Sequence, residues 1–105
     1  MDRKLKGRYA ARAVMLKAMA HPTRLMIIEA LSKKEHCVCE LTDMAGDDTS
    51  TVSKHLSVLK NAGIIGDEKR GQSVFYRLTM PCALKFLSCI ESAMRERAHA
   101  QMAAV

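Results

Sequence analysis

The stretch that decides the fold is residues 48–63, DTSTVSKHLSVLKNAG. Asp48 is a favoured N-cap residue, and Gly63 stands where a left-handed residue would end a helix. Apolar side chains recur at helical spacing between them, at Val52, Leu56 and Leu59. This spacing predicts a short helix with one apolar edge that packs on a core.

The first two turns of this predicted helix carry mostly short polar side chains on the other face. They are Thr49, Ser50, Thr51, Ser53, Lys54 and His55. Exposed helix faces are more often rich in Glu and Lys, so an ordinary solvated face is the weaker interpretation. Hydroxyls, an ammonium and an imidazole beside the free N–H groups of a helix N-terminus suit the phosphates and base edges of a DNA major groove.

The segment before residue 48 supports this interpretation. Residues 39–45, CELTDMA, predict another short helix, and Gly46-Asp47 predicts a tight turn. Two short helices joined in this way form a helix-turn-helix, in which the second helix reads the DNA.

After Gly63 the pattern changes from helical to strand-like. Ile64-Ile65 and residues 73–78, SVFYRL, predict two strands, joined through a polar stretch that ends in Lys69-Arg70-Gly71-Gln72. A hairpin with a cationic tip directly after a reading helix is typical of a wing, whose tip reaches the sugar-phosphate backbone or a minor groove. A solvated hairpin is the alternative.

Helices are predicted on both sides of this core, over residues 9–20, 22–33 and 81–98. Residues 1–8 are charged and expected to be mobile, residues 33–36 form a polar connection, and the tail after residue 98 is expected to fray. The fold class is mainly α with a small β-hairpin, a winged helix-turn-helix with four helices, two strands and a last helix. We expect residues 1–105 to form one such domain, with terminal helices 9–20 and 81–98 that dimerise.

The composition narrows the choice of partner. Seventeen Lys and Arg against eleven Asp and Glu give a net charge of +6, which favours a polyanion. A two-fold dimer would place its reading helices on half-sites about 34 to 36 Å apart, so the expected partner is double-stranded DNA with an imperfect inverted-repeat operator.

Several classes of protein find no support. No run of about 18 apolar residues and no secretory signal is present, so we expect a cytoplasmic protein without a membrane partner and with reduced cysteines. No nucleophile and base pair, Gly-rich phosphate loop or hydrolase motif occurs, so neither an enzyme nor a catalytic cofactor is expected.

Four segments resemble the ArsR/SmtB family of small dimeric winged-helix repressors over nearly the whole chain. They are LKAMAHPTRLMIIEAL at 16–31, EHCVCELTD at 35–43, STVSKHLSVLKNAGII at 50–65 and GDEKRGQSVFYRL at 66–78. The resemblance implies that Ser50, Thr51, Ser53, Lys54 and His55 lie on the DNA-reading helix. It also implies that Arg70 and Gln72 lie at the wing tip.

Cys37 and Cys39 are the candidate effector ligands, at the start of the first helix of the helix-turn-helix. Positions i and i+2 of a regular helix point about 200° apart, so we expect that turn to open before both sulfurs meet one ion. A thiophilic ion would then deform the helix and lower DNA affinity. The alternative is that both are small buried hydrophobes. The neighbouring Lys33, Lys34 and His36 favour ligands, because positive charges lower the pKa of a thiol.

The CVC motif followed by an acidic residue and Leu resembles the arsenic-responsive branch, and also the cadmium and lead sensors. The latter add cysteines from an N-terminal arm, and no Cys precedes Cys37. The expected inducer is therefore arsenic(III) or antimony(III), which take three thiolates. A thiol redox or persulfide-sensing repressor of the same fold and a cadmium or lead sensor are the alternatives.

The third thiolate is an open question, because arsenic repressors commonly carry a third Cys where this chain has Thr42. Cys82, Cys89, the partner subunit or a small thiol such as glutathione could supply it. Cys89 is the weaker candidate, since its neighbours Leu87 and Ile90 favour a core or dimer-interface position.

Overall fold

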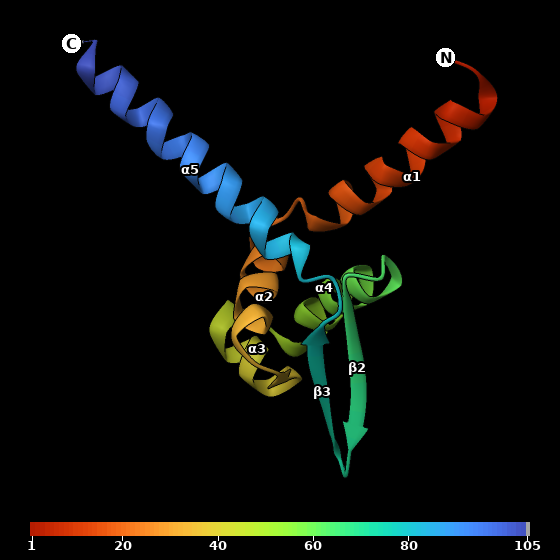
Figure 1. The fold of residues 1–105 in the computed structure, drawn as a ribbon. Helices are drawn as coiled ribbons and strands as arrows, with labels where there is room; N and C mark the ends of the chain where they lie inside the picture. The colour runs from red at the N-terminus through yellow and green to blue at the C-terminus, as the bar shows by residue number, and fades with distance from the viewer. Residues whose placement is uncertain (105) are drawn as a thin grey trace.

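The computed structural model describes residues 1–104, and over these residues it has five helices and a three-stranded antiparallel sheet (Figure 1). The elements follow in the order α1 (Arg3–Met19), α2 (Pro22–Lys33), β1 (His36–Cys37), α3 (Val38–Ala45), α4 (Thr49–Asn61), β2 (Ile65–Arg70), β3 (Ser73–Leu78) and α5 (Cys82–Ala103). This arrangement confirms the predicted fold class, a mainly helical winged helix-turn-helix.

The core lies where α2, α3, α4 and the base of the wing meet. Its fully buried side chains come from all of these elements and include Ile27, Ile28, Leu41, Val52, Leu56, Leu59 and Ile64. Each such aliphatic side chain contributes roughly 1.5–3 kcal/mol when it leaves water. The apolar edge predicted from residues 48–63 is therefore confirmed, since its three members are all in this set.

Local signals define the helix-turn-helix as predicted. Asp48 is the N-cap of α4, and its Oδ1 accepts a hydrogen bond from the Thr51 N–H at 2.7 Å. Gly46 ends α3 in the left-handed conformation with φ 71°, and Gly63 follows α4 with φ 80°. Glycine adopts these angles without the steric cost that a Cβ imposes, so the two turns occur where the sequence predicts them.

The connection between α2 and α3 differs from the prediction. Its last residue, His36, is not in a polar loop but pairs with Tyr76, and Cys37 pairs with Phe75, so that the sheet has the order β1-β3-β2. A two-residue strand is too short to show any alternation in sequence. It forms because the folded chain brings β3 alongside it.

The wing is also longer than predicted. The polar stretch after Ile65 belongs to β2, which pairs with β3 from Ile65↔Leu78 to Arg70↔Ser73, and only Gly71-Gln72 turns. The outer half of this hairpin projects into solvent on both faces (Figure 1). Such a strand needs no apolar alternation, which is why the sequence pattern missed it.

Both terminal helices extend beyond their predicted limits. α1 already begins at Arg3, because Asp2 caps it through a hydrogen bond from the Leu5 N–H to Asp2 Oδ1 at 2.8 Å. α5 continues to Ala103, so the tail after residue 98 is helical as far as the structure describes it. The prediction of a mobile start and a frayed tail is wrong for these residues.

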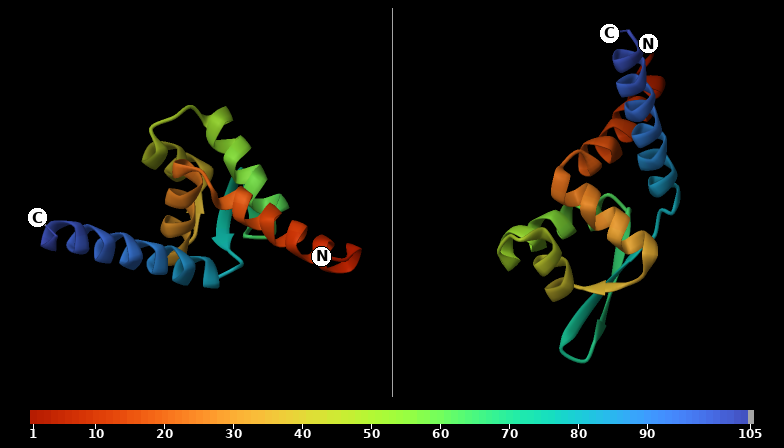
Figure 2. Two further views of the ribbon diagram at one scale, coloured as in Figure 1. Left: turned by 90° about the horizontal axis from the view of Figure 1, so that it is seen from above. Right: turned by 90° about the vertical axis from the view of Figure 1, so that its left-hand side faces the viewer.

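The two terminal helices diverge from the core on the side opposite the wing tip (Figures 1 and 2). Large apolar side chains are exposed along them: Tyr9, Val14 and Leu16 on α1, and Phe86, Ile90, Met94 and Met102 on α5. Over residues 1–104, none of the helices has the length and apolarity to cross a bilayer.

Candidate DNA-binding surface and thiol site

The predicted reading residues lie on the first two turns of α4. Thr49, Ser50 and Lys54 are exposed, whereas Thr51 and Ser53 are half-buried. The Ser50 hydroxyl donates to Asp48 Oδ1 at 3.1 Å. The Thr51 N–H, followed by the hydroxyls of Thr51 and Ser50, lowers the pKa of Asp48, so its carboxylate stays ionised at the helix N-terminus.

His55, also predicted to read DNA, is half-buried and faces α2. Its ring stacks on that of His21, with centroids 4.2 Å apart. His21 is the N-cap of α2, and its Nδ1 accepts a hydrogen bond from the Thr23 N–H at 3.1 Å. Burial, and then electrostatic interactions with His21 and Arg24, lower the pKa of His55. His55 therefore joins two helices through a neutral ring, a contact that sequence reasoning missed.

The wing tip carries Gln72, which is exposed, and Arg70, which is held by neighbours. Arg70 Nη2 lies 2.7 Å from Glu35 Oε2 and 3.3 Å from Glu68 Oε2. Its guanidinium also lies over the Phe75 ring, 4.9 Å from the centroid. The hydrogen bonds to Glu68 and then Glu35 raise the pKa of Arg70. Glu35 was not among the predicted functional residues, because nothing in its neighbourhood in sequence indicates a contact with the wing.

The thiol pair lies at the junction of β1 and α3, and its geometry differs from the prediction. Cys37 is not in the helix: it is the N-cap of α3, with extended backbone angles φ −80° and ψ 164°. The argument from helical spacing therefore does not apply. Cys37 lies before the first turn of α3, so the separation of about 200° between helical positions is not imposed on the two thiols.

The pKa of Cys37 is raised, and the largest cause is hydrogen bonding with the Cys39 thiol. The expectation that neighbouring positive charges lower it is wrong for Cys37. Its side chain is 7% exposed, whereas Cys39 is exposed. The pair thus has one buried sulfur and one that solvent reaches.

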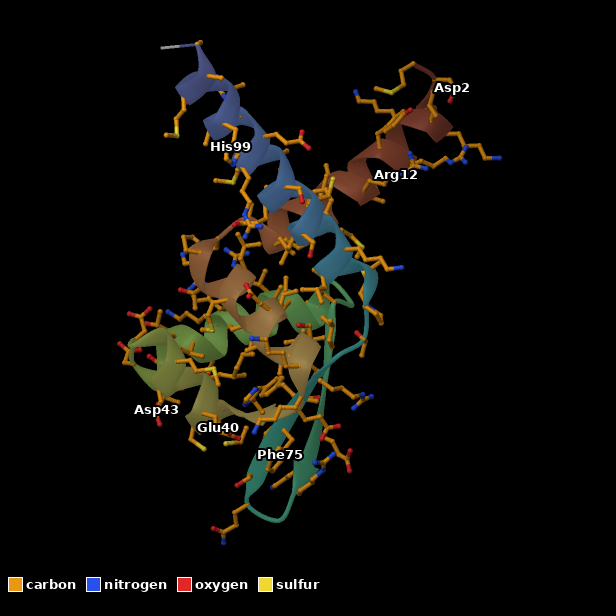
Figure 3. The ribbon with its side chains drawn as sticks, turned by 60° about the vertical axis from the view of Figure 1, so that its left-hand side comes forward. Asp2, Arg12, Glu40, Asp43, Phe75 and His99 are labelled. Carbon is orange, nitrogen blue, oxygen red and sulfur yellow. The ribbon has the colours of Figure 1, made fainter. Side chains whose placement is uncertain are left out.

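Glu40 organises this junction. Its Oε1 accepts a hydrogen bond from the Cys37 N–H at 3.2 Å, and its Oε2 lies 3.3 Å from His36 Nδ1. Cys37 and Glu40 form a capping box, in which the Cys37 side chain faces the Glu40 N–H. These contacts lower the pKa of Glu40, chiefly through the Cys37 N–H. Figure 3 shows Glu40 and Phe75 near each other, where α3 begins beside the wing.

The remaining cysteines lie on α5 and are exposed. Cys82 lines a cavity between α1 and α5, with Met15 and Met80 among the other lining residues. Cys89 is exposed, so it does not lie in the core of the single chain. Within residues 1–104 no three side chains of His, Cys, Asp or Glu are grouped to hold a metal ion, so neither α5 thiol completes a set of three with Cys37 and Cys39.

Comparison with known proteins gives consistent results. The family described as "Bacterial regulatory protein, arsR family" matches residues 21–66. The HTH-type transcriptional repressor SmtB of Mycobacterium tuberculosis is 41% identical over 64 residues, which are 61% of this chain and 47% of SmtB. The chain thus spans about half the length of that relative.

Two further proteins are similar over more of their length. An uncharacterized HTH-type transcriptional regulator of Methanocaldococcus jannaschii is 40% identical over 70 residues, which are 66% of this chain and 79% of that protein. The crystal structure of the transcriptional repressor BigR from Xylella fastidiosa superposes with a TM-score of 0.74 at 32% identity, covering 89% of this chain and 96% of that one.

Proposed function

Since the chain belongs to the ArsR family of bacterial regulatory proteins, we propose that it is a homodimeric, cytoplasmic repressor that binds an inverted-repeat operator. The repressor leaves this operator when Cys37 and Cys39 bind arsenic(III) or antimony(III). The relatives SmtB and BigR are transcriptional repressors. The observation that carries the proposal is the placement of one buried and one exposed thiol at the start of α3, the first helix of the helix-turn-helix, where β1 pairs with the wing.

The proposed DNA-binding surface is the N-terminal half of α4 together with the wing. Exposed Thr49, Ser50 and Lys54 would meet base edges and phosphates. Thr51, Ser53 and His55 are half-buried, so they would support the position of the helix more than they read bases. Arg70 and Gln72 at the wing tip would reach the backbone or minor groove of the flanking DNA.

A homodimer accounts for the apolar surface of the terminal helices. Residues as large as Phe86 and Met94 are 45% and 64% exposed in the single chain. Contiguous exposed apolar surface of this kind marks an interface. A two-fold axis through α1 and α5 would cover it and leave the wings free on the opposite side (Figure 2).

The donor set supports two of the three thiolates that trivalent arsenic takes. Arsenous acid exchanges each hydroxyl for a thiol sulfur, and the hydroxyl leaves as water with the thiol proton. The reaction with two thiols is therefore balanced without a base, and a raised pKa at Cys37 does not oppose it. The third thiolate would come from Cys82 or Cys89 of the partner subunit, or from glutathione.

A thiol redox or persulfide sensor of the same fold is the second candidate, and the same pair of interacting thiols favours it. Peroxide would oxidise the two thiols to a disulfide and itself be reduced to two waters, with one proton from each thiol. A cadmium or lead sensor is a further alternative. It needs thiolates, whose formation at Cys37 is disfavoured by its raised pKa.

Fluorescence anisotropy on an operator selected from random duplex DNA tests the proposal. Arsenite added to the fully reduced protein is expected to release the DNA. Cys37→Ser and Cys39→Ser should retain binding but lose this release. Ser is a favoured N-cap, so Cys37→Ser preserves the start of α3. Cys82→Ser and Cys89→Ser in the same assay test whether either α5 thiol supplies the third thiolate.

Release that persists in both Ser variants would move the inducer site away from the pair. Release by peroxide and not by arsenite or antimonite would favour the redox sensor.

A further inference from the structure

Strand β1 connects the thiol site to the wing by covalent and hydrogen-bonded routes. Cys37, its last residue, caps α3 and pairs across the sheet with Phe75 of β3. A ligand on the Cys37 sulfur therefore acts on a residue that is itself part of the sheet of the wing. No other strand of the described chain lies on that side of β3.

The residue directly before β1 reaches the wing a second time. Glu35 Oε2 lies 2.7 Å from Arg70 Nη2, the shortest ion pair that the described residues make. The Arg70 guanidinium also covers the ring of Phe75, the strand partner of Cys37. Residues 35–37 thus hold the wing at two points, by strand pairing at Cys37 and by the ion pair at Glu35.

The charges at this point oppose DNA binding. Arg70 lies between the carboxylates of Glu35 and Glu68, so the cluster of one cation and two anions carries a net negative charge. Both carboxylates contact Nη2 of Arg70, so a phosphate that approached this nitrogen would compete with them. The side chains of Arg70 and Glu35 are 43% and 41% exposed, and ion pairs at such sites are weak. A DNA phosphate can therefore displace Glu35.

We propose that Glu35 and the DNA backbone compete for Arg70, and that a ligand bridging Cys37 and Cys39 tips this competition toward Glu35. Glu35 is then a positioning residue, which acts through Arg70. The bridge fixes the junction of β1 with α3, and so keeps Glu35 against the wing when the operator would pull Arg70 away. By linkage, DNA lowers the affinity for the ligand by the same factor. The effect of the ligand that bridges the two thiols rests on the proposed function, whereas the competition between Glu35 and DNA for Arg70 does not.

A double-mutant cycle on operator DNA, without any inducer, tests the competition. Glu35→Gln should bind DNA about two- to fivefold more tightly than wild type, the range expected when a weak surface ion pair no longer restrains the cation. In the Arg70→Ala background the same change should have no effect. An equal gain in DNA affinity in both backgrounds would show that Glu35 acts only through repulsion between its own charge and DNA, and would overturn the proposal.

The ratio of the DNA affinity without arsenite to the DNA affinity with arsenite tests the link to the thiols. Glu35→Gln should lower this ratio, while arsenite binding, followed by absorbance of the sulfur-to-arsenic bands, remains as in wild type. Glu68→Gln is the matched control, because Glu68 also contacts Arg70 but lies on β2, outside residues 35–37. It should tighten DNA binding and leave the ratio unchanged. An unchanged ratio in Glu35→Gln, or an equal fall in both variants, would overturn the link.

Failure of the proposed inducer can be distinguished from failure of the competition between Glu35 and DNA for Arg70. If arsenite does not release the wild-type protein, the proposed inducer is wrong, and the cycle on inducer-free DNA still decides whether Glu35 competes for Arg70.

Discussion

The ring of His55 on α4 stacks on the ring of His21, the N-cap of α2, with centroids 4.2 Å apart and planes inclined by 38°. Through this contact the helix proposed to read DNA is packed on the most buried helix of the core. The two rings come from segments that α2, β1 and α3 separate in the sequence.

His55 makes stability depend on pH. Its pKa in the folded protein is lower than the ordinary value of 6.5, so the folded state binds a proton less readily than the unfolded state. The free energy of unfolding should therefore fall as the pH drops from 6.5 through the folded pKa. His55→Asn should flatten this dependence in urea denaturation at pH 7.5 and 5.5, and should cost about 1 kcal/mol at pH 7.5 through lost stacking. His99→Asn, on exposed α5, is the control and should follow wild type.

Lys54 is exposed on α4 and makes no ion pair with the residues that the structure describes. Lys54→Ala should weaken binding to all DNA sequences alike and reduce the slope of log affinity against log salt by about one, if it meets one phosphate. Lys60→Ala is the control on the same helix, since Lys60 Nζ lies 3.0 Å from Asp67 Oδ2. Anisotropy titrations over a range of salt measure both. An unchanged slope in Lys54→Ala would remove Lys54 from the interface.

Gly46 ends α3 with φ 71° and has open space where a Cβ would stand. Gly46→Ala should destabilise the protein by about 1–2 kcal/mol, through backbone strain without any clash. Gly7→Ala, inside α1 and also in open space, should stabilise it by about 0.5–1 kcal/mol. Thermal unfolding compares the two. Equal changes in stability in the two variants would show that the positive φ of Gly46 does not determine the cost of adding a Cβ there.

Phe86 tests the dimer, because it is exposed on α5 and lines the cavity between α1 and α5. Phe86→Glu should place a charge in the proposed interface and shift the protein to the monomer in analytical ultracentrifugation. Met44 on α3 is similarly exposed, at 48%, and lies away from the terminal helices. Met44→Glu should leave the oligomeric state unchanged. A Phe86→Glu protein that remains dimeric would place the interface elsewhere.

The raised pKa of Cys37 separates two kinds of inducer. A divalent soft cation displaces the proton of that thiol, so Cys37 alone should contribute a rise in its affinity of about tenfold for each pH unit between pH 6 and 8. Arsenous acid takes the proton away as water, so its affinity should change little over the same range. Competition titrations at pH 6 and pH 8 measure this difference. In Cys37→Ser, the affinity for the cation should depend less strongly on pH.

Much of the fold could be predicted from short-range signals. The limits of α4 follow from Asp48 and Gly63, which act within one turn of the residues that they cap. The buried edge of the same helix follows from its spacing. The resemblance agreed with the residue pattern on the reading helix and the wing, and α4 and the β2–β3 hairpin lie where both place them.

The same reasoning failed where a residue takes its conformation from a distant segment. Cys37 was treated as helical because it stands beside a helix in sequence, yet its pairing with Phe75 draws it into an extended strand. That difference removes the argument about the sulfurs: Cys37 lies outside the helix, so the cost of opening a helical turn does not arise.

By itself, the sequence determined the order of the helices, the N-cap at Asp48 and the turn at Gly46, because periodicity and capping act over a few neighbouring residues. Only the tertiary structure decided that His55 packs on His21, that Cys37 is part of the sheet and that Glu35 holds Arg70. Those contacts join segments far apart along the chain, and their geometry exists only once the core has brought the segments together.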